Sequence, residues 1–84
     1  RVRIHNQLDE PYAIISIITL DRSGLLALIG KVFAKFSLSV HSAKILTFGE
    51  KAEDFFYVSY QGGHLKDQDM CEQLYQQLHD VLKN

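Results

Sequence analysis

The residues with the most chemical potential in this chain form one short loop, Asp21-Arg22-Ser23-Gly24-Leu25-Leu26. The loop follows a run of β-branched residues and precedes a helical apolar pattern, which predicts a strand-to-helix junction. Backbone N–H groups at the N-terminus of a helix have no partner within the helix and can hold an anion or a carboxylate. The loop carries one Asp, one Arg and one Ser, but no base nearby in the sequence that would activate a nucleophile. The pattern therefore favours ligand binding over catalysis.

The chain has 84 residues, a length typical of one small domain, which we expect to span residues 1–84. Because the chain opens on Arg1 rather than Met, we expect it to be a fragment of a larger protein. A content of 46% hydrophobic and 23% charged residues is typical of a globular protein. The net charge of −1 and the lack of a basic block argue against a surface that binds nucleic acid.

The sequence also argues against a membrane or secreted location. The longest apolar run, from Tyr12 to Ile18, is far too short to cross a bilayer. No secretory signal is visible. Cys71 is the only cysteine, so an internal disulfide is impossible and a reducing compartment is favoured. We therefore expect a cytoplasmic protein that binds no membrane.

Apolar periodicity predicts the order strand, strand, helix, strand, strand, helix. In the third strand the apolar positions change parity between Val40 and Ala43, which indicates a β-bulge. Gly30 lies in the middle of the first helix, where we expect it to mark close packing on the sheet. The predicted strands are Val2–Asn6, Tyr12–Leu20, Leu38–Phe48 and Ala52–Tyr60, and the predicted helices are Gly24–Ser37 and a segment that is capped by Asp67 and ends near Leu82. The predicted connections include the loop Gln7–Pro11 and the hairpin turn Gly49-Glu50-Lys51.

This order predicts an α+β fold, a ferredoxin-like two-layer sandwich with an antiparallel sheet and both helices on one face. The usual last strand is missing, and we expect the N-terminal strand to take its place at the sheet edge. The helices leave the other face of the sheet bare. Alternation in the last strand points Phe56 and Val58 towards the helices. The outward apolar side chains, which we expect to form an interface, are Ile14, Ile18, Phe55 and Tyr57.

Several runs of residues resemble the ACT domain, a small ligand-binding regulatory module of amino-acid metabolism. They are Asp21–Ala27, then Phe33, and then Leu38–Ile45. The run Thr47–Val58, with its Gly-Glu-x-x-x-Asp-x-Phe pattern, is most similar to ACT domains that sense glutamine for separate catalytic domains of the same polypeptide. The resemblance covers essentially residues 14–82. It implies the ACT-type version of the sandwich and a sensor that is not itself an enzyme.

The resemblance implies that an amino acid, glutamine by similarity, binds between the loop of one ACT unit and a strand of its neighbour. The carboxylate would accept hydrogen bonds from the N–H groups of the Gly24–Leu26 segment, and the amino group would face Asp21. The other implied partners are a second ACT domain or a homodimer and the upstream catalytic domains; no cofactor is implied. ACT domains usually carry proline where this chain has Ser23, and often asparagine or glycine at the position of Ser42. The expected ligand-binding residues are Asp21, Arg22, Ser23, Gly24, Leu25, Leu26 and Ser42.

Two alternatives stay open. The loop could be a plain strand-to-helix connection in which Asp21 or Ser23 only caps the helix. The domain could also be a dimerisation or protein-interaction module that pairs sheets or edges and binds no metabolite. Sedimentation with and without amino acids distinguishes the second alternative from a sensor.

Three other functions are disfavoured. Outward aromatic side chains on such a sheet can stack RNA bases, but Glu53 and Asp54 stand where the RNA-binding signature has a basic residue and a glycine. Arg22 resembles the loop arginine of acylphosphatase, but the phosphate cradle of that enzyme is not visible. No metal site is expected, because the candidate ligands are dispersed: His5, His41, His64, His79 and Cys71.

Overall fold

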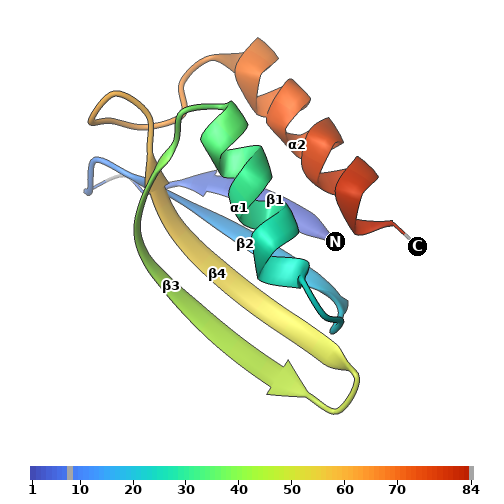
Figure 1. Cartoon of the computed structure of the whole chain (residues 1–84). Coiled ribbons are helices and arrows are strands. Elements are labelled where there is room, and N and C mark those ends of the chain that lie inside the picture. Colours follow the sequence, from blue (N-terminus) through green and yellow to red (C-terminus); the bar gives the residue numbers. More distant parts are fainter. Residues whose placement is uncertain (8, 84) are drawn as a thin grey trace.

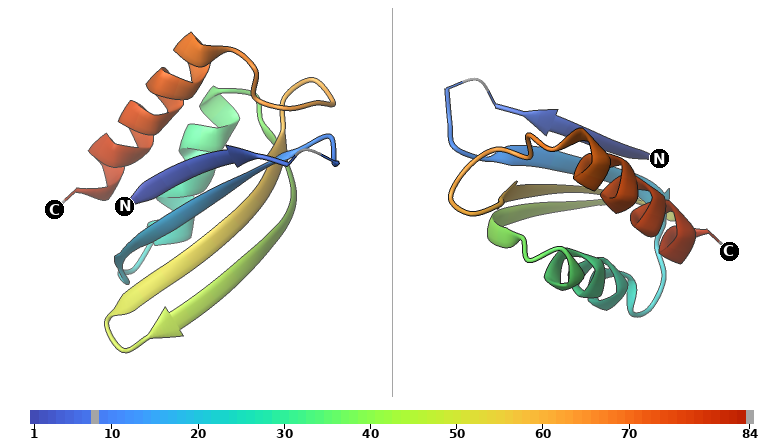
Figure 2. Two further views of the ribbon diagram at one scale, coloured as in Figure 1. Left: turned by 180° about the vertical axis from the view of Figure 1, so that it is seen from behind. Right: turned by 90° about the horizontal axis from the view of Figure 1, so that it is seen from above.

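The computed structural model describes residues 1–7 and 9–83 and contains one four-stranded antiparallel sheet and two helices (Figure 1). Both helices lie on the same side of the sheet, as the view from above in Figure 2 shows. This arrangement confirms the predicted element order and the ferredoxin-like two-layer sandwich. The elements are β1 (Val2–Asn6), β2 (Ala13–Leu20), α1 (Leu25–Lys35), β3 (Ser39–Phe48), β4 (Lys51–Ser59) and α2 (Gln68–Leu82). Of the predicted loop Gln7–Pro11, Leu8 lies outside the described residues.

The N-terminal strand occupies one edge of the sheet, whose strand order is β1-β2-β4-β3. β1 runs antiparallel to β2, with Ile4 opposite Ile15. It thus stands where the last strand of a ferredoxin-like fold would pair, and the prediction for this strand is confirmed. Among residues 1–7 and 9–83, neither helix combines the length and the hydrophobicity of a membrane-spanning segment.

The core lies between the sheet and the two helices. The inward side chains of β2, Ala13, Ile15 and Ile17, are completely buried. They meet α1 through the apolar stripe that its sequence predicts, and α2 through leucines spaced four residues apart. Burying each large aliphatic side chain contributes about 1.5–3 kcal/mol, so this layer provides most of the stability of the sandwich. The buried helix residues are Leu25, Ile29, Val32, Phe33, Leu74, Leu78 and Leu82.

The hairpin between β3 and β4 differs slightly from its prediction. The pairing register shifts between Val40 and Ser42, which confirms the predicted bulge. Only Gly49 and Glu50 form the turn, because Lys51 already pairs with Phe48 in the ladder. Gly49 has a φ of 59°, and two-residue hairpin turns require such positive angles.

The start of α1 was predicted one residue too early. Gly24 is the N-cap, and its φ of 77° is left-handed and therefore incompatible with a helical residue. No side chain forms a capping hydrogen bond at this end, so capping by Asp21 or Ser23 is wrong. By contrast, Asp67 caps α2 as predicted, because its carboxylate accepts hydrogen bonds from two N–H groups of the first turn.

The prediction for Gly30 is also wrong. Gly30 is exposed on α1, and a Cβ at this position would meet nothing within 4 Å. The residue lies on the solvent side of the helix, whereas the neighbouring Ile29 faces the core. Close packing on the sheet therefore does not explain this glycine.

Candidate functional site

The loop between β2 and α1 is held against the β3–β4 turn. The N–H of Asp21 donates a hydrogen bond to the carbonyl of Glu50 at 2.8 Å. The N–H of Leu25 donates to the carbonyl of Arg22 at 3.3 Å, so this group is already used within the loop. Gly24 and Leu26 have N–H groups without a hydrogen-bond partner among the described residues. Two of the three N–H groups predicted to hold a carboxylate are therefore open to a ligand.

A hollow of about 240 Å³ lies beside this loop, between the N-terminus of α1 and the ends of β3 and β4 nearest their turn. Pockets for drug-sized ligands measure about 300–1,000 Å³, so this one suits a smaller metabolite. The hollow brings together the predicted ligand-binding residues Asp21, Arg22, Gly24, Leu25 and Leu26. The other lining residues, which sequence reasoning did not assign to the site, are Ala27, Ile45, Thr47, Ala52 and Asp54.

Arg22 connects the loop to the far end of the chain. Its guanidinium Nη2 donates a hydrogen bond to the carbonyl of Val81 at 2.7 Å, in the last turn of α2. A cation at this end of a helix is favourable, because the helix dipole places partial negative charge there. Arg22 therefore joins the rim of the hollow to α2. A direct contact between Arg22 and a ligand stays a prediction.

The structure does not bring Ser23 or Ser42 into the hollow. Ser23 is exposed in the loop and does not line it. Ser42 is paired with Tyr57 in the sheet, and antiparallel partners share a face, so Ser42 lies on the open face. The hollow instead lies on the helix side. A contact between Ser42 and a ligand at the loop of its own chain is therefore excluded, and a contact at another unit stays a prediction.

Asp54 is the unusual residue of this site. Its side chain is on the helix side of β4 and is only 1% exposed. Neither carboxylate oxygen has a hydrogen-bond partner in the described part of the chain. Burial, and secondarily the negative charge of Asp21, raises the pKa of this carboxyl above its ordinary value of 3.8.

Sequence reasoning missed Asp54, although the signal was present. The buried positions of β4 alternate through Ala52, Asp54, Phe56 and Val58. A carboxylate at one of these inward positions stands out, because buried charges are normally paired. The inward parity that places Phe56 and Val58 in the core therefore also places Asp54 there.

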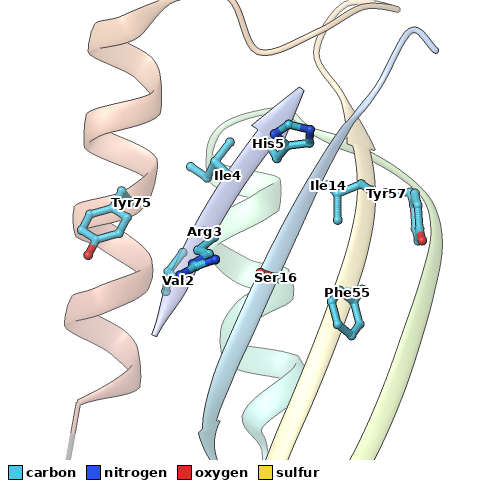
Figure 3. Close-up of a pocket in the computed structure, with 9 residues that line it drawn as sticks. All are labelled: Val2, Arg3, Ile4, His5, Ile14, Ser16, Phe55, Tyr57 and Tyr75. Atoms are coloured by element: carbon cyan, nitrogen blue, oxygen red, sulfur yellow. The ribbon is translucent and has the colours of Figure 1, made fainter. Parts of the chain in front are cut away.

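The open face of the sheet carries the four predicted interface side chains, Ile14, Ile18, Phe55 and Tyr57, all partly buried. Figure 3 shows three of them over β2 and β4, where Ile14 is paired with Tyr57. Their outward parity is confirmed, and their role in an interface stays a prediction. A hollow of about 720 Å³ extends from this face around β1 to Tyr75 of α2, and its lining residues are Val2, Arg3, Ile4, His5, Ile14, Ser16, Phe55, Tyr57 and Tyr75.

The strand β3 forms the other edge of the sheet and is exposed along nearly its whole length. Its apolar side chains Val40, Ile45 and Phe48 are 49%, 44% and 62% exposed. Within the described residues, no strand pairs with the outer side of β3. A long apolar edge of this kind is a template for pairing with another chain.

The remaining candidate nucleophiles and metal ligands among the described residues lie outside the hollow beside the loop. His41 Nε2 lies 2.7 Å from the Oγ of Ser59, and neither residue lines that hollow. The thiol of Cys71 donates to the carbonyl of Leu65, and burial, followed by the charge of Asp67, raises its pKa. In residues 1–7 and 9–83, no group of three or more His, Cys, Asp or Glu side chains could hold a metal ion.

Comparison with known proteins gives strong similarity to one kind of enzyme. The chain is 44% identical over 75 residues to the bifunctional uridylyltransferase/uridylyl-removing enzyme of Pseudomonas savastanoi pv. phaseolicola. The aligned region covers 88% of this chain but only 8% of the length of that enzyme. The enzymes of the same name from Stutzerimonas stutzeri and Azotobacter vinelandii are 46% identical over 77 residues and 45% identical over 75 residues, covering 9% and 8% of their lengths. No protein-family model matches the chain. The chain is therefore homologous to one short segment of bifunctional uridylyltransferase/uridylyl-removing enzymes.

Proposed function

We propose that this chain is an ACT-type regulatory domain of a bifunctional uridylyltransferase/uridylyl-removing enzyme and that it senses glutamine in the cytoplasm. Identities of 44–46% to segments of such enzymes support this parent. The observation that carries the sensing role is the small hollow at the N-terminus of α1, where two N–H groups are open to a ligand. The chemistry of transfer and removal would belong to other domains of the same polypeptide.

The ligand carboxylate would accept hydrogen bonds from the N–H groups of Gly24 and Leu26. Hydrogen bonds to a charged group contribute about 1.5–3 kcal/mol each, and the dipole of α1 adds to the attraction. Asp21, which lines the same hollow, would face the ammonium group. These contacts are made by the backbone and one carboxylate, so they recognise the common part of an amino acid.

The loop is suited to transmit occupancy because two of its residues are bonded to two other elements. Asp21 is bonded to the β3–β4 turn through Glu50, and Arg22 is bonded to α2 through Val81. A ligand that orders this loop in one arrangement would therefore bias the turn and the end of α2 together. Regulation follows only if the ligand prefers one arrangement of the parent enzyme over another.

Isothermal calorimetry of the chain with glutamine tests the proposal. We expect a saturable heat that Asp21→Asn weakens, because this substitution removes the negative charge that faces the ligand. Glu50→Gln is the matched control: it removes an equal charge from an exposed side chain of the adjacent turn and should leave the affinity unchanged. Absence of any saturable heat with the wild-type chain would refute glutamine sensing by this domain.

A second function, a ligand-free interaction module, is favoured by the exposed edge strand β3. Two copies that pair along this edge would satisfy its backbone groups and cover Val40 and Ile45. Analytical ultracentrifugation with and without glutamine separates the two functions. A dimer that is independent of glutamine, disrupted by Val40→Lys and accompanied by no heat of binding would favour the interaction module.

A further inference from the structure

We propose that Asp54 is the main receptor for the α-ammonium group of the ligand, which Asp21 also faces, so that the hollow accepts free amino acids and rejects analogues that lack this group. The proposal deepens the function proposed above and rests on it, because the same hollow is involved. Asp54 comes from β4, in the middle of the sheet, and not from the loop that carries the other ligand-binding residues.

The first observation is that Asp54 is buried without a partner. It is 1% exposed, and neither oxygen accepts a hydrogen bond from any described residue. Buried carboxylates in proteins are paired or bound to a cation, because the interior cannot solvate the charge. Such an orphan indicates a partner that arrives from outside the chain.

The second observation is that no neighbour in the hollow supplies this partner. Of the side chains that line it, only Arg22 and Thr47 can donate a hydrogen bond, and neither donates one to Asp54. Arg22 is instead directed to the carbonyl of Val81. The rest of the lining is apolar or acidic.

The third observation is the polarity of the hollow. One wall carries the N-terminus of α1, with its partial positive charge and the open N–H group of Leu26. The other wall carries the carboxylates of Asp54 and Asp21. A zwitterionic amino acid is complementary to both walls, because its carboxylate and its ammonium group have the opposite charges. The volume of the hollow, about 240 Å³, restricts the ligand to a molecule about as small as an amino acid.

Calorimetry tests the proposal with glutamine and with 4-carbamoylbutanoate, which is glutamine without its amino group. We expect the wild-type chain to bind glutamine at least about tenfold more tightly than this analogue, the smallest effect expected of one hydrogen bond to a charged group. Asp54→Asn should remove most of this preference by weakening glutamine alone. Glu53→Gln is the matched control, because Glu53 is the preceding residue of β4 and points to the opposite face.

A titration of the Asp54 carboxyl by carbon NMR gives a second measurement that needs no variant. Bound glutamine should lower the pKa of Asp54, because an adjacent ammonium group stabilises the carboxylate. The analogue should leave this pKa unchanged or raise it. This measurement decides the matter if Asp54→Asn does not fold.

The possible failures are distinct. If the wild-type chain binds glutamine but Asp54→Asn binds it equally well, or if bound glutamine leaves the pKa of Asp54 unchanged, the role of Asp54 is refuted and the glutamine sensor stands. Equal affinity of the wild-type chain for glutamine and for the analogue also refutes the role of Asp54 alone. If the wild-type chain binds neither compound, both proposals fall.

Discussion

Replacing Asp54 with leucine should make the protein more stable at neutral pH. A buried polar group without a hydrogen bond costs about 1–3 kcal/mol in protein mutational data, and both oxygens of Asp54 are in this position. Leucine would remove this cost and pack against the apolar lining of the hollow, such as Leu25 and Ile45, while the hollow accepts the added volume. We expect Asp54→Leu to raise the free energy of unfolding by about 1–3 kcal/mol. In a domain of this size, each kcal/mol raises the melting temperature by about 4–8 °C.

The stability that Asp54→Leu gains over the wild-type protein should increase as pH rises. Because the pKa of Asp54 is raised in the folded state, the folded protein holds a proton at pH values where the unfolded chain has lost it. The stability of the wild-type protein therefore falls as pH rises from near 3.8 through the folded-state pKa. The advantage of Asp54→Leu should be largest at pH 7 and should shrink as pH approaches 3.8. Asp21 and Arg22, the other charged residues of the hollow, are the same in both proteins.

Urea denaturation followed by circular dichroism, at pH 7 and near pH 4, measures both effects. Glu53→Leu is a suitable control, because it removes an equal charge from the opposite face of the same strand and should change stability by no more than about 0.5 kcal/mol. A loss of stability in Asp54→Leu at pH 7 would refute the reasoning, as would a gain of the same size at both pH values. The same variant should lose its affinity for glutamine, so that stability and binding change in opposite directions.

Four further substitutions test other parts of the structure. Gly24→Ala should lower the free energy of unfolding by about 1–2 kcal/mol, because the backbone of Gly24 is left-handed. Gly30→Ala should raise it by up to about 1 kcal/mol, because Gly30 is an exposed helical residue with open space around it. Thermal melts in which both variants change the melting temperature in the same direction would contradict this. Asp67→Ala should cost about 0.5–2 kcal/mol by removing the cap of α2, and an unchanged denaturation midpoint would show that the cap is dispensable. Phe55→Asp should dissociate any assembly through the open face while changing the melting temperature little; a sedimentation profile identical to that of the wild type would count against an interface there.

The element order, the parity of the strands and the bulge of β3 could all be predicted from the amino-acid sequence. These features follow from local periodicity, since a strand with apolar residues at every second position can bury only one parity. The alternation that buries Phe56 and Val58 is therefore readable without coordinates. The place of β1 at the sheet edge could also be predicted, because the fold has one vacant strand position and the chain has one additional strand.

Which polar groups of the site already have a hydrogen-bond partner depends on the tertiary structure and could not be predicted. Arg22 is bonded to Val81, which is 59 residues away in the sequence, and the N–H of Leu25 is used inside its own loop. Asp54 could be placed inward from its parity, but the absence of a partner depends on every side chain that approaches it from other elements. Periodicity fixes the direction in which a side chain points, whereas its partners depend on distances between segments that are far apart in the chain.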